Sequence, residues 1–164
     1  MTERMRTIGL MADPGVPEMV AGSVAADVSR ELSDEPGETG AMVPWEVEVS
    51  RTTLPITRLG EIPLMQQAQG IRDERGWDYV LYLADLPRAH EDQLMLCETS
   101  SAAQAALVCL PALGAFRLRA RTAELLVALV RSMQQGSGEF PSAAAARHAL
   151  GYGAVHRVSP GGDG

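Results

Sequence analysis

The feature that most constrains the fold of this chain is a set of three apolar runs that each end close to a proline. Residues 6–12, 78–84 and 105–110 are rich in branched, aromatic and small apolar residues, and a proline follows each run closely. Proline has no N–H group for a strand ladder, so it ends a buried strand. Continuous apolar runs of this length are typical of strands that are buried on both faces of a parallel sheet.

The intervals between these runs show other periodicities. In residues 16–32 valine recurs at every fourth position, with a proline in the first turn, and this spacing predicts a helix. Residues 61–75 and 116–133 each have one apolar face and predict two further helices. Residues 45–50 alternate between apolar and polar, which predicts a strand near a sheet edge. Residues 93–99 predict a strand that forms an antiparallel hairpin with the apolar run after it.

The order of these elements predicts the fold class. Strands that are joined through helices are parallel and connected by right-handed crossovers. We therefore expect a three-layer α/β/α domain with a mixed, mostly parallel five-stranded sheet that carries an antiparallel hairpin at its edge. Residues 1–135 are assigned to this single domain. Residues 136–164 are rich in Gly, Ala and Ser and are assigned to a C-terminal extension or linker, with a short helix predicted at 142–149.

Composition and charge limit the function. The net charge is −7, whereas a general nucleic-acid binder needs a basic face to meet phosphates, so we expect no nucleic-acid partner. All 14 basic residues are arginine, and the absence of lysine and asparagine is explained by a GC-rich bacterial genome. The polar N-terminus leads directly into a strand, and no apolar run is long enough to span a bilayer. These features predict a cytoplasmic location.

The cysteines and histidines do not form a known catalytic or metal motif. Cys97 and Cys109 lie in apolar strands, which predicts reduced, buried thiols rather than a disulfide. His90, His148 and His156 lack the spacing of zinc ligands. No serine stands in a Gly-x-Ser-x-Gly elbow. We therefore expect no metal and no cofactor.

Candidate ligand-binding residues follow two of the predicted parallel strands. In open α/β sheets, ligands lie outside the carboxyl ends of the strands. Asp13 and Asp85 come just after two such ends, and Arg88 and His90 follow soon after. These four side chains could perform acid–base work or bind a polar ligand. The alternative is that the two aspartates form turns and accept hydrogen bonds from nearby N–H groups.

Several of these segments together resemble a known group of proteins. The segments are residues 8–15 (Ile-Gly-Leu-Met-Ala-Asp-Pro-Gly), the Trp45 strand, residues 78–87, and residues 110–114 with the arginine-rich helix after them. They are similar to the N-terminal part of uncharacterised actinobacterial proteins in which such a domain precedes several membrane-spanning helices. The likeness covers residues 5–135. It implies a cytoplasmic domain attached to a membrane region and implies no particular activity.

The predicted topology is also similar to the first half of metzincin-type zinc proteases. In those proteins the helix after the last strand carries the HExxH zinc ligands. The corresponding segment here, residues 117–124, contains no histidine. Glu124 would therefore have no zinc-bound water to activate, and this likeness implies that the protease site is absent.

The sequence thus predicts a non-catalytic regulatory or interaction domain, the cytoplasmic part of a membrane-attached bacterial protein. Its partner would be another protein or its own membrane region, and an oligomer is compatible with the sequence. The alternative is a small-ligand-binding protein or hydrolase whose site at the carboxyl edge contains Asp13, Asp85, Arg88 and His90. A concave pocket between the ends of the first and third strands would favour the alternative.

Overall fold

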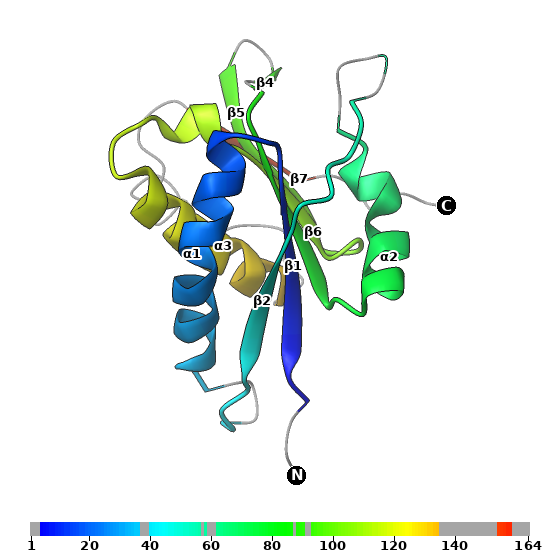
Figure 1. Cartoon of the computed structure of the whole chain (residues 1–164), viewed down its shortest axis with the longest axis vertical. Coiled ribbons are helices and arrows are strands. Elements are labelled where there is room, and N and C mark those ends of the chain that lie inside the picture. Colours follow the sequence, from blue (N-terminus) through cyan, green and yellow to red (C-terminus); the bar gives the residue numbers. More distant parts are fainter. Residues whose placement is uncertain are drawn as a thin grey trace.

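The computed structural model describes residues 4–36, 40–56, 58, 62–86, 88–90, 93–134 and 154–158 (Figure 1). In chain order the elements are β1 (Arg6–Ala12), α1 (Val16–Ser33), β2 (Trp45–Ser50), α2 (Leu64–Arg75), β3 (Tyr79–Ala84), β4 (Arg88–His90), β5 (Gln93–Ser100), β6 (Ala105–Cys109), the 3-10 helix η1 (Leu110–Leu113), α3 (Leu118–Gln134) and β7 (Ala154–Val158). The helices and the five longer strands of the predicted domain are all present.

The described strands form one mixed sheet in the order β2-β1-β3-β6-β5-β4, and β7 pairs with β5. β1 pairs in parallel with β2 and β3, and β3 pairs in parallel with β6, whereas β5 and β6 form an antiparallel hairpin. The predicted α/β fold with a mostly parallel sheet and an antiparallel hairpin is therefore confirmed. The short strands β4 and β7 are additional. β7 lies in the predicted C-terminal extension, and the helix predicted at 142–149 lies outside the described residues.

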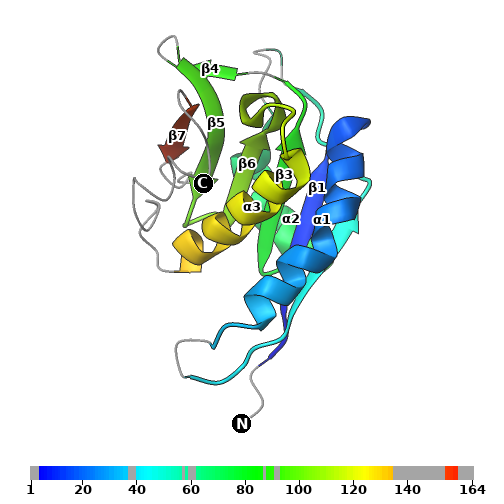
Figure 2. The same cartoon turned by 90° about the vertical axis from the view of Figure 1, so that its left-hand side faces the viewer.

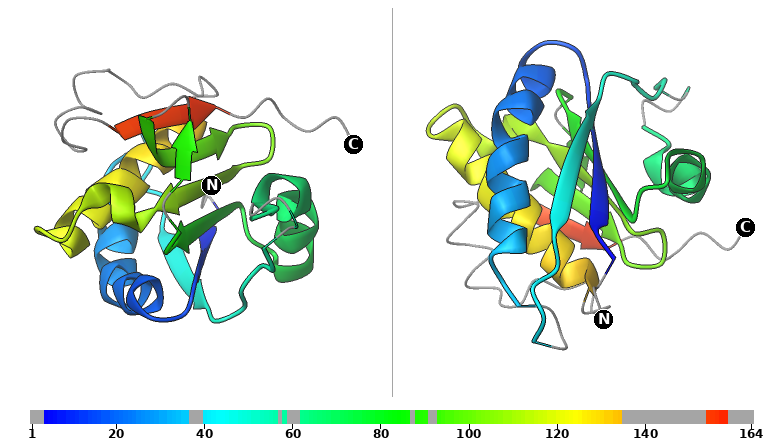
Figure 3. Two further views of the ribbon diagram at one scale, coloured as in Figure 1. Left: turned by 90° about the horizontal axis from the view of Figure 1, so that it is seen from above. Right: turned by 60° about the horizontal axis from the view of Figure 1, so that its bottom comes forward.

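The helices cover both faces of the sheet. α1 and α3 pack side by side on one face, and α2 packs on the other (Figures 2 and 3). The chain moves outward from β1 to β2 through α1 and then returns past β1 to β3 through α2. Because this reverses the direction of travel, right-handed crossovers place α1 and α2 on opposite faces. The reversal point lies between β1 and β3, where open α/β sheets form a ligand crevice.

Two apolar clusters hold these layers together. The larger one joins α1 and α3 to the sheet and includes Val24, Val28, Leu126 and Val130. Aliphatic side chains make up most of it, as the low aromatic content of 4% requires. The smaller cluster joins α2 to the other face and includes Tyr82, which is fully buried. All three helices predicted from periodicity contribute apolar residues to these clusters, because each buries a stripe that would otherwise meet water.

A close contact fixes the connection between α2 and β3. The indole ring of Trp77 packs directly against Gly9 in β1, where a Cβ atom would lie 1.9 Å from Trp77 Cε3. The indole N–H donates to Glu48 Oε2 at 3.0 Å, and Glu48 is the β2 partner of Gly9 in the sheet. The guanidinium of Arg75 covers the ring at 5.4 Å from its centre. Only glycine at position 9 leaves room for this ring.

Candidate functional site

The carboxyl edge of the sheet is organised by the loop after β1. The Asp13 N–H donates to the Leu83 carbonyl at 2.9 Å, which ties this loop to β3. Gly15 then takes a φ of +95°, a conformation that L side chains rarely adopt, and Pro17 is buried in the first turn of α1. The Asp-Pro-Gly sequence therefore turns the chain sharply from β1 into α1.

The carboxylate of Asp13 is fully engaged in this turn. Its Oδ1 accepts a hydrogen bond from the Tyr82 hydroxyl at 2.6 Å, and its Oδ2 accepts one from the Asp85 N–H at 2.9 Å. The Tyr82 hydroxyl oxygen in turn accepts the Leu54 N–H at 3.3 Å. One carboxylate thus ties together the ends of β1 and β3, and the tyrosine adds the loop after β2. This geometry favours the turn-forming interpretation of Asp13.

The protonation of Tyr82 keeps this arrangement in place. Burial raises the pKa of the Tyr82 hydroxyl well above its usual range, and the hydrogen bond to Asp13 raises it further. The hydroxyl therefore remains a donor to Asp13 at all physiological pH values. The pair acts as a structural brace, because the Tyr82 hydroxyl does not release its proton near neutral pH.

The four predicted site residues are placed differently from one another. Asp13 and Asp85 lie together, as the hydrogen bond between them shows, and Asp85 itself is exposed. Arg88 and His90 are on β4, whose backbone pairs with β5 rather than with β3. Their side chains lie outside the described part of the structure. Joint ligand binding by these four residues therefore stays a prediction.

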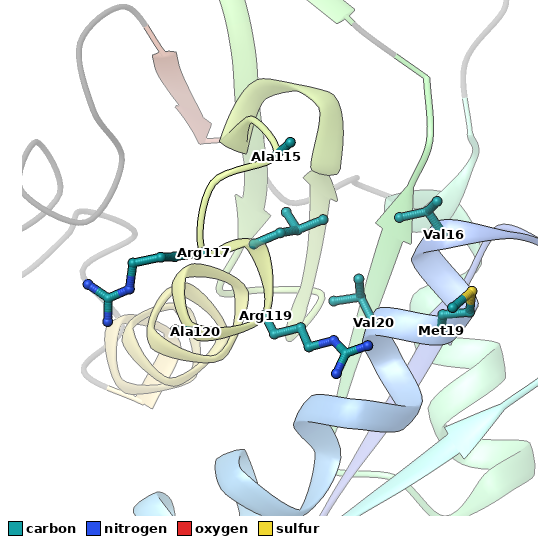
Figure 4. A pocket seen from close by; sticks show the side chains of 8 residues that line it. Val16, Met19, Val20, Ala115, Arg117, Arg119 and Ala120 are labelled. Carbon is teal, nitrogen blue, oxygen red and sulfur yellow. The ribbon is translucent and has the colours of Figure 1, made fainter.

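A concave groove does lie at this edge, but between the first turns of α1 and α3 rather than between β1 and β3 (Figure 4). Its volume is about 520 Å³, which falls in the range of small-molecule sites. It is lined by Val16, Met19, Val20, Ala115, Arg117, Leu118, Arg119 and Ala120. Neither Asp13 nor Asp85 lines it. No periodicity in the sequence predicts this groove.

Apolar side chains at the groove are unusually exposed. Val16 is 52% exposed and Met19 is 67% exposed, although the valine periodicity of α1 predicts that Val16 belongs to its apolar stripe and that Met19 lies beside it. Phe116, which lies between the lining residues Ala115 and Arg117, is 78% exposed. Exposed apolar side chains that gather at one place mark a contact surface more often than isolated ones do. We call these three residues and the groove the α1–α3 surface.

The charge at the α1–α3 surface is positive. The side chains of Arg117 and Arg119 make no hydrogen bond or ion pair with any residue that the structure describes, and the first turn of α3 contains no acidic residue. Arg117 also has a φ of +51°, which is uncommon for a residue other than glycine. By contrast, Arg121 donates to the Leu113 carbonyl and so holds η1 against α3.

The remaining candidate groups give no second site in the described residues. No cluster of three or more histidine, cysteine or acidic residues that could hold a metal ion occurs among them. Cys97 and Cys109 are buried and are not joined in a disulfide, as predicted. Burial raises the pKa of the Cys97 thiol above its usual range, with a smaller effect from Cys109, and such a thiol is a poor nucleophile.

Comparisons with protein-family models, with curated protein sequences and with solved structures find no match to this chain.

The two raised pKa values predict that stability falls in alkali. Cys97 and Tyr82 are neutral when protonated, and each has a higher pKa in the folded state than in the unfolded state. The contribution of each group to the free energy of unfolding is therefore complete below its unfolded-state pKa and is lost as the pH rises towards its folded-state pKa. We expect the free energy of unfolding to fall from about pH 8.5, where unfolded cysteine ionises, and more steeply above about pH 10. Each group adds a slope of about 1.4 kcal/mol per pH unit.

Urea unfolding followed by circular dichroism between pH 7 and pH 11 measures this. Tyr82→Phe should remove the steepening above about pH 10, and Cys97→Ala should remove the earlier part of the fall. Identical slopes in the parent and in both variants would show that these two groups do not control the alkaline transition.

Proposed function

We propose that this chain is a non-catalytic interaction domain, the cytoplasmic part of a membrane-attached bacterial protein, and that it contacts its partner through the α1–α3 surface. The observation that carries the proposal is the exposed apolar group of Val16, Met19 and Phe116 beside two arginines whose side chains have no partner in the described part of the chain. Exposed apolar side chains that gather at one place are typical of surfaces that another molecule covers. The resemblance to domains that precede membrane helices supports the membrane attachment.

The hydrogen bonding of Asp13 at the carboxyl edge supports a binding role rather than a catalytic one. A general acid or base must be free to reach a substrate proton, whereas each oxygen of Asp13 accepts a hydrogen bond from the protein itself. None of the helices among the described residues is long and apolar enough to cross a bilayer.

Site-specific photo-crosslinking in the producing bacterium tests the interaction surface. We expect p-benzoylphenylalanine in place of Phe116 to give an adduct of discrete mass. Replacing Met42 by the same residue should not, because Met42 is also exposed, at 58%, but precedes β2 at the amino edge. Met19→Asp should abolish the adduct from position 116. Equal adducts from positions 116 and 42, or none from 116, would contradict the proposal.

The membrane attachment has its own test. An antibody against the domain should detect the protein in the membrane fraction, in a chain that is larger than the 17.5 kDa of this sequence. Detection of a 17.5 kDa chain in the soluble fraction alone would refute this part.

A further inference from the structure

The groove of the α1–α3 surface has the form of a ligand site rather than of a flat contact patch. Its walls come from two helices that approach each other at their first turns, and Val20 at its base is only 4% exposed. The volume of about 520 Å³ is enough to enclose a chain of several methylene groups. A concave apolar wall of this size remains wet in the free protein, so an apolar chain that replaces the water is bound favourably.

One end of the groove carries a positive charge that has no counterion among the described residues. The Arg119 side chain extends from α3 across the groove towards Val20 on α1 (Figure 4). No acidic residue lines the groove. The neighbouring carboxylates are directed elsewhere, because Glu18 lies 3.8 Å from Arg51 and Asp13 is held by Tyr82 and Asp85.

Other arginines on the helices do have partners, so the lack of a partner is particular to the groove. Arg30 pairs with Asp27 on α1, and Arg131 pairs with Glu35. On α2, Arg72 donates to the Ala103 carbonyl. Arg119 differs from these in having no partner among the described residues while standing beside exposed apolar side chains. The groove is therefore complementary to a molecule that is apolar along its length and anionic at one end.

We propose that the groove binds a single-chain amphiphile with an anionic head, of which a fatty-acid carboxylate is the simplest example. The chain would lie along Val16, Met19 and Val20, and the head would meet the Arg119 guanidinium through a charge-assisted hydrogen bond. A bilayer surface fits less well, because it would contact the protruding Phe116 and leave the concave wall unfilled. This inference rests on the proposed role of the α1–α3 surface and names the ligand class for it.

Isothermal titration of the 164-residue chain with octanoate, decanoate and dodecanoate, each below its micellar concentration, tests the proposal. We expect saturable binding of one molecule per chain. The dissociation constant should fall about threefold to fourfold per added methylene until the groove is full. Dodecyltrimethylammonium, which has the same chain and a cationic head, should bind about tenfold or more weakly.

Matched variants connect this binding to the groove. Arg119→Gln should weaken dodecanoate binding about tenfold, whereas Arg6→Gln should not, since Arg6 is an exposed arginine at the opposite edge of the sheet. Met19→Ser should also weaken binding, and Met42→Ser should leave it unchanged. All four side chains are exposed, so each variant is expected to fold, which circular dichroism checks.

Three outcomes would overturn the inference. The first is equal affinity for the cationic and anionic amphiphiles, and the second is dodecanoate binding that Arg119→Gln does not change. The third is binding to phosphatidylglycerol vesicles without binding of dodecanoate, which would make the surface a bilayer contact. The crosslink from position 116 is measured separately. A specific adduct without amphiphile binding therefore refutes the ligand class alone, whereas loss of both refutes the proposed function as well.

Discussion

Replacing Gly9 by alanine is expected to destabilise the domain by about 3 kcal/mol or more. The new Cβ would lie 1.9 Å from Trp77 Cε3 and 2.1 Å from Trp77 Cδ2, far inside van der Waals contact. Relief requires the indole to move, and the ring is held by its hydrogen bond to Glu48 and by the Arg75 guanidinium over it. Displacing the ring would also open the smaller apolar cluster, to which Trp77 belongs.

Urea unfolding monitored by circular dichroism measures this effect, with Gly22→Ala as the control. A Cβ at Gly22 on α1 would meet nothing within 4 Å, so the control should stabilise the domain by about 0.5–1 kcal/mol. In a Trp77→Ala background the cost of Gly9→Ala should shrink to below about 1 kcal/mol, because the clashing ring is gone. The same cost in both backgrounds would show that the ring contact is not its source.

This contact illustrates what the sequence could not provide. The strands and helices followed from local periodicity, and their order then fixed the parallel pairings through the crossover rule. Gly76 also ends α2 in the left-handed conformation, with a φ of +71°, as a glycine after an apolar stripe predicts. The packing of Trp77 on Gly9 joins residues far apart in the sequence, and no local pattern encodes it. β4 and β7 were missed for a similar reason, since both depend on pairing with β5.

The candidate site was predictable only in part. Topology alone placed Asp13 and Asp85 at the same edge, and the structure brings them into direct contact. The groove was missed because periodicity shows which side of a helix is apolar but not which part of that side a neighbouring helix covers. Val16 and Met19 lie in the first turn of α1, where both side chains are exposed at the groove. The sequence did contain one signal for the groove. Phe116 is an apolar residue with arginine neighbours and no acidic residue nearby.

The second large effect on stability is expected at Asp13, and Asp85 serves as its control. Asp13→Ala should destabilise the domain by about 3 kcal/mol, because it removes two hydrogen bonds and leaves the buried Tyr82 hydroxyl without its acceptor. Asp85→Ala should change the free energy of unfolding by less than about 0.5 kcal/mol, since the Asp85 backbone N–H makes the bond and its exposed side chain does not.

A double-mutant cycle of Asp13→Ala and Tyr82→Phe separates a brace from a ligand site. If the carboxylate acts through Tyr82, the two costs should be non-additive by about 1–2 kcal/mol in urea unfolding, because each variant removes the same bond. The free energy of unfolding of Asp13→Asn should lie between those of the parent and of Asp13→Ala, since an amide offers one oxygen where the carboxylate offers two. If Asp13→Ala instead kept full stability, the turn-forming interpretation would be wrong. An unchanged free energy of unfolding would mean that the Asp13 carboxylate does not stabilise the turn and is available to a ligand. The carboxyl-edge site with Asp85 would then become the stronger hypothesis.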